Sequence, residues 1–233
     1  MGDDILVFSN VSLARDESTG DLVMEEVDFT VREGGCLMVE LDEEAPCPPL
    51  ADAAQGLVDP VQGRVFFRGE DWMDMSPDRV VDVRSVIGRV YATGTWVNNL
   101  DLDENITLSQ RHHTSRSMDE ILYEARELAE RFGLKELPAV RPEWADNSEE
   151  RICQWVRAMM GKPQLLLLER PTREASDWEC DKLVQAVVEA MHNGAGVLWL
   201  SSDVRILKNQ SILPVTRVKF GGNRLTESIE VQS

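Results

Sequence analysis

The hydrophobic pattern of the chain alternates between short apolar runs and longer stretches with helical spacing. Three runs are short and almost entirely apolar: 36–41, 165–169 and 197–200. Such runs are typical of parallel strands that are buried on both faces. Three longer stretches repeat apolar residues every three or four positions: 118–132, 148–160 and 177–191. Buried strands that alternate with amphipathic helices predict an α/β domain with a mainly parallel sheet.

Two-residue alternation dominates the first thirty residues. It predicts strands over Ile5–Leu13 and Val23–Val31, separated by a turn at Asp16–Asp21. Further along, we expect a short helix from Leu50 to about Leu57, opened by two prolines, and a strand over Arg64–Arg68. A late hairpin is expected at Val215–Phe220 followed by Gly221-Gly222-Asn223.

The clearest helix boundaries surround the stretch that begins at Met118. Ser117 and Glu120 have the spacing of a capping box, in which each side chain accepts a hydrogen bond from the other residue's amide. Gly133 follows the last apolar position and predicts the end of this helix.

Composition narrows the range of functions. The 233 residues carry 42 acidic against 24 basic side chains, a formal net charge of −18. So negative a surface repels phosphate backbones and anionic lipid headgroups, which argues against nucleic-acid binding and direct membrane insertion. We see neither the apolar start of a signal peptide nor a membrane-spanning run, and expect a cytoplasmic protein. The four cysteines are far apart, so we expect reduced, mostly buried thiols and no metal site.

Five segments, in this order, resemble ATPase subunits of ATP-binding-cassette (ABC) transporters. They are EEVDFTVREGGCLMVEL, AQGLVDPVQGRVFFRGED, MDEILYEARELAERFGL, ERICQWVRAMMGKPQLLLLERPT and VLWLSSD. The resemblance implies an ABC-ATPase-like (P-loop NTPase-type) α/β domain with an antiparallel β subdomain, a mainly parallel core sheet and a helical subdomain. It extends over nearly the whole chain, so we expect one domain over 1–233, with the helical subdomain at roughly 93–161.

The chain departs from the family where phosphate should bind. The family needs glycines whose amides face the phosphates, then a lysine and a Ser/Thr. Here LDEEAPCPP occupies 41–49, with Cys47 at the lysine position and Pro48 after it. Prolines have no amide hydrogen to donate, and Asp42–Glu44 add negative charge. This acidic stretch is either solvated surface or a partner-binding or self-blocking loop.

The other chemical positions of the family are also replaced. Glu169 and Arg170 stand at the magnesium-binding aspartate and the catalytic glutamate, and Ala92 stands at the glutamine that senses the γ-phosphate. The signature maps to Ala145–Glu149, with Ser148 inside it, the D-loop aspartate to Ser176, and the switch histidine to Ser202. No aromatic residue for adenine stacking lies near Ala14 or Arg15.

These replacements lead us to expect no nucleotide, metal or cofactor at the vestigial positions, which are Cys47, Pro48, Ala92, Ser148, Glu169, Arg170 and Ser202. Arg170 stays protonated and cannot act as a general base, although Glu169 could still reach a metal. In this family each nucleotide site combines one subunit's phosphate loop with its mate's signature, so a chain lacking both would spoil both sites of a dimer.

A partner surface is expected at Thr93–Asp101, which corresponds to the segment that contacts a permease in the family. The candidate contact residues are Thr95, Trp96, Val97, Asn98, Asn99 and Leu100. Trp96 and Val97 would form an apolar anchor for the partner. The alternative is that Trp96 packs locally.

The main functional expectation is a catalytically inactive ABC-ATPase-like subunit with a structural or regulatory role on a membrane transport complex. Its partners would be an integral membrane permease and either a second ABC-type subunit or a second copy of itself. One alternative is a divergent ATP-hydrolysing ABC subunit with displaced active-site residues, and another is a soluble scaffold unrelated to transport. The spacing of NITLSQRHHTSRSMDEI also resembles ABC subunits of lipid-trafficking (Mce-type) systems.

Overall fold

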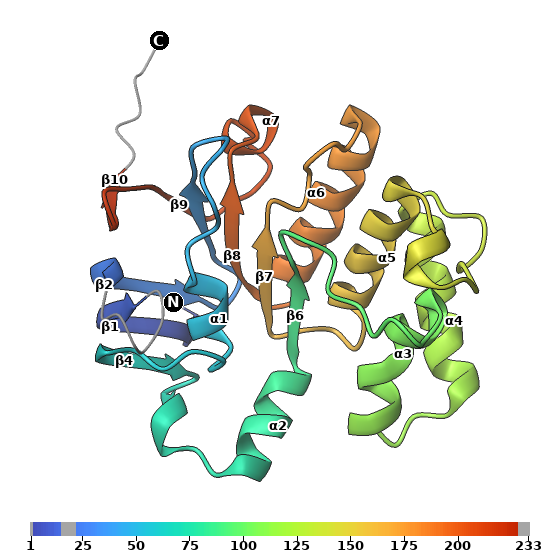
Figure 1. Cartoon of the computed structure of the whole chain (residues 1–233), viewed down its shortest axis with the longest axis horizontal. Helices are drawn as coiled ribbons and strands as arrows, with labels where there is room; N and C mark the ends of the chain where they lie inside the picture. Colours follow the sequence, from blue (N-terminus) through green and yellow to red (C-terminus); the bar gives the residue numbers. More distant parts are fainter. Residues whose placement is uncertain (1, 15–21, 228–233) are drawn as a thin grey trace.

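Two β-sheets form the frame of the protein (Figure 1). The computed structural model describes residues 2–14 and 22–227. The smaller sheet is antiparallel, with strands β1 (Asp4–Ala14), β2 (Leu22–Arg32), β4 (Gln62–Phe67) and β5 (Glu70–Asp71) in the order β2-β1-β4-β5. The predicted turn at 16–21 and Arg15 lie outside the described residues.

The larger sheet is the core of the fold, with the strand order β10-β9-β3-β8-β7-β6. Its strands are β3 (Cys36–Glu40), β6 (Ile87–Val90), β7 (Leu165–Glu169), β8 (Gly196–Ser201), β9 (Val215–Gly221) and β10 (Arg224–Glu227). All pairings are parallel except β9 with β10, which forms the predicted hairpin.

Successive side chains of the core sheet enter two different hydrophobic clusters. Leu166 and Leu168 pack in one cluster with the helices α3 to α6, while Leu165 and Leu167 pack in the other with the antiparallel sheet. Both faces are therefore covered, which explains why the sequences of the inner strands are mostly apolar.

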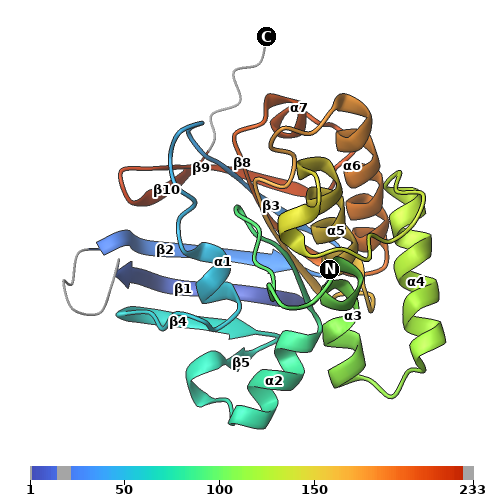
Figure 2. The same ribbon diagram turned by 45° about the vertical axis from the view of Figure 1, so that its right-hand side comes forward.

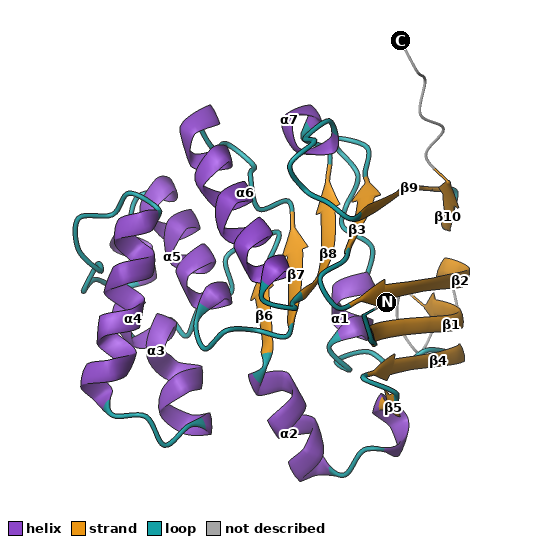
Figure 3. Ribbon diagram, turned by 180° about the vertical axis from the view of Figure 1, so that it is seen from behind, coloured by secondary structure: helices purple, strands orange, loops and turns teal. Residues whose placement is uncertain are grey.

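The helices divide between these two faces. α1 (Leu50–Ala54) lies between the two sheets and buries Leu50 and three alanines, whose small side chains allow close packing. α3 (Leu102–His113), α4 (Met118–Arg131), α5 (Asn147–Met159) and α6 (Asp177–His192) lie on the other side (Figures 2 and 3). α2 (Pro77–Ser85) follows a 3-10 turn at Trp72–Asp74, and a second such turn at Pro142–Trp144 precedes α5. The short α7 (Val204–Leu207) follows β8.

Each of the helices α3, α4, α5 and α6 begins with a capping box, and the sequence predicts the one in α4. In α4 the Ser117 hydroxyl accepts from the Glu120 amide at 3.3 Å, and the Glu120 carboxylate accepts from the Ser117 amide at 2.8 Å. α5 and α6 repeat the arrangement at Asp146–Glu149 and Ser176–Glu179. Satisfying these amides fixes where each helix starts.

The predicted fold class is confirmed, and the differences are local. The first helix ends at Ala54 rather than near Leu57. None of the predicted ranges covers α2, α3, β6 or the short α7. α2 buries only Val83, so it has almost no apolar face, and β6 is four residues long with an arginine inside it. Both therefore lack the periodicity on which a prediction depends.

The packing of β6 against α5 requires a glycine at position 88. A Cβ atom there would lie 1.9 Å from the carbonyl oxygen of Ala158. We expect Gly88→Ala to lower the free energy of unfolding by about 1–3 kcal/mol, the usual cost of overpacking. Urea denaturation measures this, with Gly221→Ala as the control because a Cβ there meets nothing within 4 Å. Equal midpoints for the two variants would contradict the close approach.

Candidate functional site

A cavity of about 840 Å³ opens at the carboxyl ends of β3, β7 and β8. Its walls come from the loop after β3 (Glu43–Cys47), the loop after β7 (Arg170 and Thr172–Glu174), the loop after β8 (Ser201–Arg205), and Ala92 and Thr93. Ligands of open α/β sheets bind at this end of the strands. The fold thus brings together four segments that the sequence analysis marked as chemical positions.

The marked residues do not all reach this cavity. Cys47, Ala92, Arg170 and Ser202 line it. Pro48 and Glu169 are buried, and Ser148 lies on α5, where its hydroxyl donates to Glu179 at 2.8 Å. The signature-like segment is therefore separate from this cavity and borders a smaller one of about 220 Å³.

Arg170 holds the loop that replaces the phosphate loop. Its guanidinium donates hydrogen bonds of 2.7 Å to the carbonyl oxygens of both Asp42 and Ala45, and one of 2.6 Å to the Ser202 hydroxyl. Its backbone φ of 47° is unusual for a residue with a side chain, which indicates a constrained position. Arg170 thus ties together the loops that follow β3, β7 and β8.

The acidic stretch Asp42–Glu44 is solvent-exposed. The Asp42 carboxylate lies 3.3 Å from Lys219 on β9, and hydrogen bonding to Asp42 raises the pKa of that lysine. Glu43 and Glu44 line the cavity. This loop therefore presents negative charge to any ligand in the cavity.

Behind the cavity, Glu169 is held in a buried ion cluster. Two nitrogens of Arg89 lie 3.0 and 2.8 Å from one carboxylate oxygen of Glu169, and a third lies 2.8 Å from Asp52. Arg89 also stacks on Tyr91, with its guanidinium carbon 4.2 Å from the ring centroid. Burial raises the pKa of Glu169, and the neighbouring Arg89 opposes that rise. A guanidinium therefore neutralises this carboxylate inside the protein.

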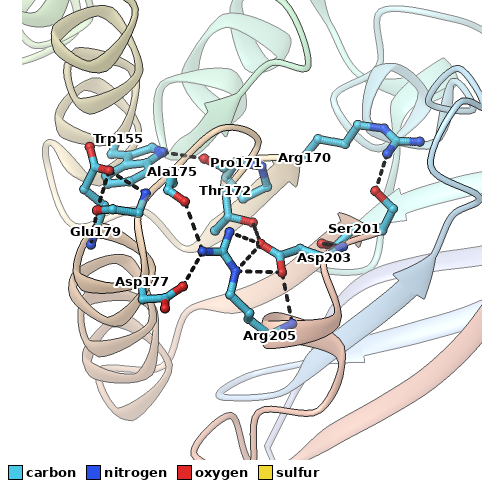
Figure 4. Close-up of polar contacts among 12 residues, drawn as sticks. Trp155, Arg170, Pro171, Thr172, Ala175, Asp177, Glu179, Ser201, Asp203 and Arg205 are labelled. Atoms are coloured by element: carbon cyan, nitrogen blue, oxygen red, sulfur yellow. Dashed lines mark hydrogen bonds and ion pairs between the residues drawn. The ribbon is translucent and has the colours of Figure 1, made fainter.

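A second polar network joins the loops that follow β7 and β8. Thr172 donates to Asp203 at 2.7 Å, and Arg205 pairs with both Asp203 and Asp177 (Figure 4). The Trp155 indole donates to the Pro171 carbonyl at 3.1 Å. These contacts fix the loops against α5 and α6.

Glu179 at the start of α6 connects that helix to α5. Burial by itself would raise the pKa of Glu179. Hydrogen bonds from the hydroxyl and amide of Ser176, the Ser148 hydroxyl and the Arg151 guanidinium outweigh it and lower the pKa to about 2. The ionised carboxylate is thus the form that the fold stabilises.

A groove of about 480 Å³ lies elsewhere, between β6, α2 and α3, and contains the predicted partner residues Thr95, Trp96 and Val97. Trp96 is half-buried: its indole donates to Glu150 at 2.6 Å and stacks on Arg157 at 4.3 Å. It packs locally, as the alternative expected, while Val97 is 43% exposed. Asn98 and Asn99 are exposed and Leu100 is half-buried.

Three arginines with structural or surface roles were missed by the sequence analysis: Arg89, Arg157 and Arg173. Arg89 interrupts the apolar run of β6, and Arg157 follows Trp155 and Val156 in the buried part of α5. For Arg89 and Arg157 the sequence does carry a signal, because each is a charged residue inside an otherwise apolar pattern. The exposed Arg173 carries no such signal.

The described part of the chain sets limits on membrane and metal sites. None of its helices combines the length and apolar character needed to cross a bilayer. Across residues 2–14 and 22–227 we also find no group of three or more His, Cys, Asp or Glu side chains arranged around a metal position.

Several known proteins are similar to this chain in sequence. No protein-family model matches the chain. The phosphonates import ATP-binding protein PhnC 2 of Synechococcus sp. (strain JA-2-3B'a(2-13)) is 23% identical, covering 94% of this chain and 86% of the relative. The lipoprotein-releasing system ATP-binding protein LolD of Idiomarina loihiensis is also 23% identical, covering 79% and 81%.

A solved structure shares the fold over almost the whole chain. The post-hydrolysis dimer of the ATP-binding cassette MJ0796, bound to ADP and Pi, superposes with a TM-score of 0.84 at 16% identity, covering 98% of this chain and all of that one. The predicted resemblance to ABC transporter ATP-binding domains is thereby confirmed, and the chain has the ATP-binding-cassette fold.

The expected catalytic inactivity is contradicted by these relatives. They are named as ATP-binding proteins of import and lipoprotein-releasing systems. The residues that differ from the family at its chemical positions change the local chemistry, but an inactive protein does not follow from them. The alternative, a divergent ATP-hydrolysing subunit with displaced residues, agrees better with the relatives.

The Arg89–Glu169 pair supports a stability prediction. Replacing Arg89 with methionine leaves a buried carboxylate without its counter-charge, so we expect the free energy of unfolding to fall by about 3–5 kcal/mol. The double variant Arg89→Met with Glu169→Leu should recover part of the loss. Arg79→Ala, which breaks the exposed pair with Glu70, is the matched control and should change little. Urea denaturation that gave Arg89→Met the midpoint of Arg79→Ala would contradict a structural role.

Glu179 supports a prediction about pH. Because its pKa falls from an ordinary 4.5 to about 2 in the folded protein, its contribution to stability is complete above pH 4.5 and is lost as the pH falls toward 2. Glu179→Gln should therefore be destabilised relative to the wild type at pH 6, and the difference should shrink between pH 4.5 and 2. Unfolding curves over this range measure it. A difference that is constant with pH would contradict the assignment.

Proposed function

We propose that this chain is a divergent ATP-binding and ATP-hydrolysing subunit of an ABC transporter that uses displaced residues. The observation that carries the proposal is a complete ATP-binding-cassette fold with a cavity at the carboxyl ends of its parallel strands. The names of the relatives support ATP as the substrate. The cavity's volume of about 840 Å³ lies within the range of small-molecule sites.

Phosphate binding is assigned to Arg173. Its exposed side chain lines the cavity and makes no hydrogen bond or ion pair with any other described residue. By contrast, Arg205 is neutralised by two aspartates, and Arg170 is occupied by carbonyl oxygens. A free guanidinium binds phosphate oxygens in a bidentate fashion. Arg173 thus replaces the family's lysine from a different loop.

Glu174 is the carboxylate best placed to orient or deprotonate an attacking water. It is exposed, follows Arg173 directly and lines the cavity. Glu169, at the family's magnesium position, does not fit a metal because Arg89 occupies its carboxylate in a buried ion pair. No step of the proposal therefore uses a divalent cation at Glu169.

We assign the binding of the transport partner to the groove beside β6. We assign contact with an integral membrane permease to the groove and its edge, Thr95–Leu100, where Val97 offers the exposed apolar contact. This would place the subunit at the inner face of a membrane, with a second cassette subunit or a second copy as a further partner. A single domain over 1–233 with a helical subdomain at 93–161, and membership of the lipid-trafficking group, stay predictions.

Nucleotide binding is the direct test. Thermal unfolding with millimolar ATP should show a raised midpoint for the wild type. Arg173→Ala should weaken binding about 10- to 100-fold, since a hydrogen-bonded charge contact contributes about 1.5–3 kcal/mol. Arg126→Ala on α4, another exposed arginine, is the control. Glu174→Gln should bind ATP normally but hydrolyse it more slowly. A wild type that ATP does not stabilise would overturn the proposal.

A further inference from the structure

The charged side chains that line the groove beside β6 are basic, although the chain as a whole is acidic. The chain has a net charge of −18, yet among the described residues that line this groove there is no aspartate or glutamate. Five side chains that carry or can accept a positive charge line it: Arg84, Arg89, Arg157, His112 and His113. Composition alone makes such a region unexpected in so acidic a chain.

Arg157 is the most informative of these residues. One of its terminal nitrogens donates to the Thr95 carbonyl at 2.7 Å, and its guanidinium lies 4.3 Å from the Trp96 ring centroid and 5.6 Å from that of Tyr91. The other terminal nitrogen is buried and makes no hydrogen bond with the described residues. Burial lowers the pKa of Arg157. One carbonyl oxygen and two ring faces support the cation, and the charge of Glu150 acts on it as well, although none of the described carboxylates lies within ion-pair distance of it.

An uncompensated buried cation is costly, because the solvation lost on burial is not replaced by a counter-charge. Among the groove arginines only Arg89 forms ion pairs with described carboxylates, which are Glu169 and Asp52, while Glu150 stabilises Arg157 only from a greater distance. Arg84 donates to the carbonyl oxygens of Gln55 and Gly56, so its hydrogen bonds are satisfied while its charge is not neutralised. The groove thus keeps a positive potential in the unbound protein.

The rim of the groove adds to this potential. His112 and His113 are exposed in the last turn of α3, where the helix dipole favours a positive charge on the side chain. Exposed Val97 and half-buried Leu108 provide apolar surface beside them. A complementary partner would therefore carry carboxylates together with at least one apolar side chain.

We propose that the groove receives an acidic segment of the permease, whose Asp or Glu side chains face Arg84, Arg157 and the two histidines. The inference rests on the proposed function for the permease itself, and adds the chemistry of the docking segment. Away from the groove the negative surface repels such a segment, and screening confines each charge to roughly 8 Å at physiological salt. Charge therefore selects both the partner and the place where it docks.

Two designed amphipathic helical peptides of equal length provide the first test. Both carry the same leucine stripe, and one has glutamate on its polar face where the other has lysine. Fluorescence anisotropy with the full chain should show the glutamate peptide binding at least about tenfold more tightly, with an affinity that falls as salt rises. Equal or tighter binding of the lysine peptide, or binding of neither peptide, overturns the inference.

Variants locate the site. Arg84→Glu, and the double variant His112→Glu with His113→Glu, should each reduce binding of the glutamate peptide, while Arg126→Glu on α4 should not. The histidine variant changes only exposed side chains, so it remains informative where Arg84→Glu or Arg157→Ala disturbs the packing. Rim variants that bind as the wild type does would place the peptide elsewhere and overturn the inference.

Cross-linking separates this inference from the proposed function. A photo-reactive benzoylphenylalanine at position 108 of the full chain, activated in native membranes, should link to a permease segment with more acidic than basic residues. Mass spectrometry identifies the segment. A permease linked through a neutral or basic segment sinks only the acidic inference, whereas no link to any integral membrane protein counts against the docking function as well.

Discussion

The core sheet is covered on both faces, and this constraint decides where any chemistry can occur. Its inner strands β3, β6, β7 and β8 are mostly apolar, because a polar side chain on either face must find a partner away from water. Arg89 is the exception within β6, and it is accommodated by Glu169, Asp52 and the Tyr91 ring. The other polar side chains that line the cavity lie at or beyond the ends of these strands. The cavity at the carboxyl ends follows directly from that arrangement.

Arg170 stands where the ABC family is expected to have its catalytic glutamate, and Arg89 pairs with Glu169 at the expected magnesium position; each does something a carboxylate could not. Arg170 donates to two carbonyl oxygens and a hydroxyl, and thereby joins three loops. Arg89 supplies inside the protein the positive charge that Glu169 requires. Both guanidinium groups stabilise structure around the cavity. The chemistry proposed for nucleotide is therefore assigned to neighbours, Arg173 and Glu174, whose side chains remain exposed.

Charge is distributed in the same selective way. The surface is strongly negative overall, whereas the groove beside β6 is lined by arginines and histidines without a carboxylate among its described residues. Arg157 illustrates the contrast, because its cation is held by two rings and one carbonyl and makes no ion pair with a described carboxylate. The cavity and the groove thus present different chemistry, since arginines and glutamates together line the cavity, whereas the charged side chains that line the groove are all basic.

The sequence by itself determined the fold class, because the apolar runs of β3, β7 and β8 and the helical spacing of α4 to α6 are local patterns that burial imposes. It also located the Ser117–Glu120 capping box, whereas the structure brought four of the marked segments together at one cavity. Only the tertiary structure decided what Arg89, Arg157 and Arg170 do, since their partners lie 80, 62 and up to 128 positions away in the chain. It likewise decided that Trp96 packs locally against α5, because the exposure of an aromatic side chain depends on neighbours that local sequence does not specify.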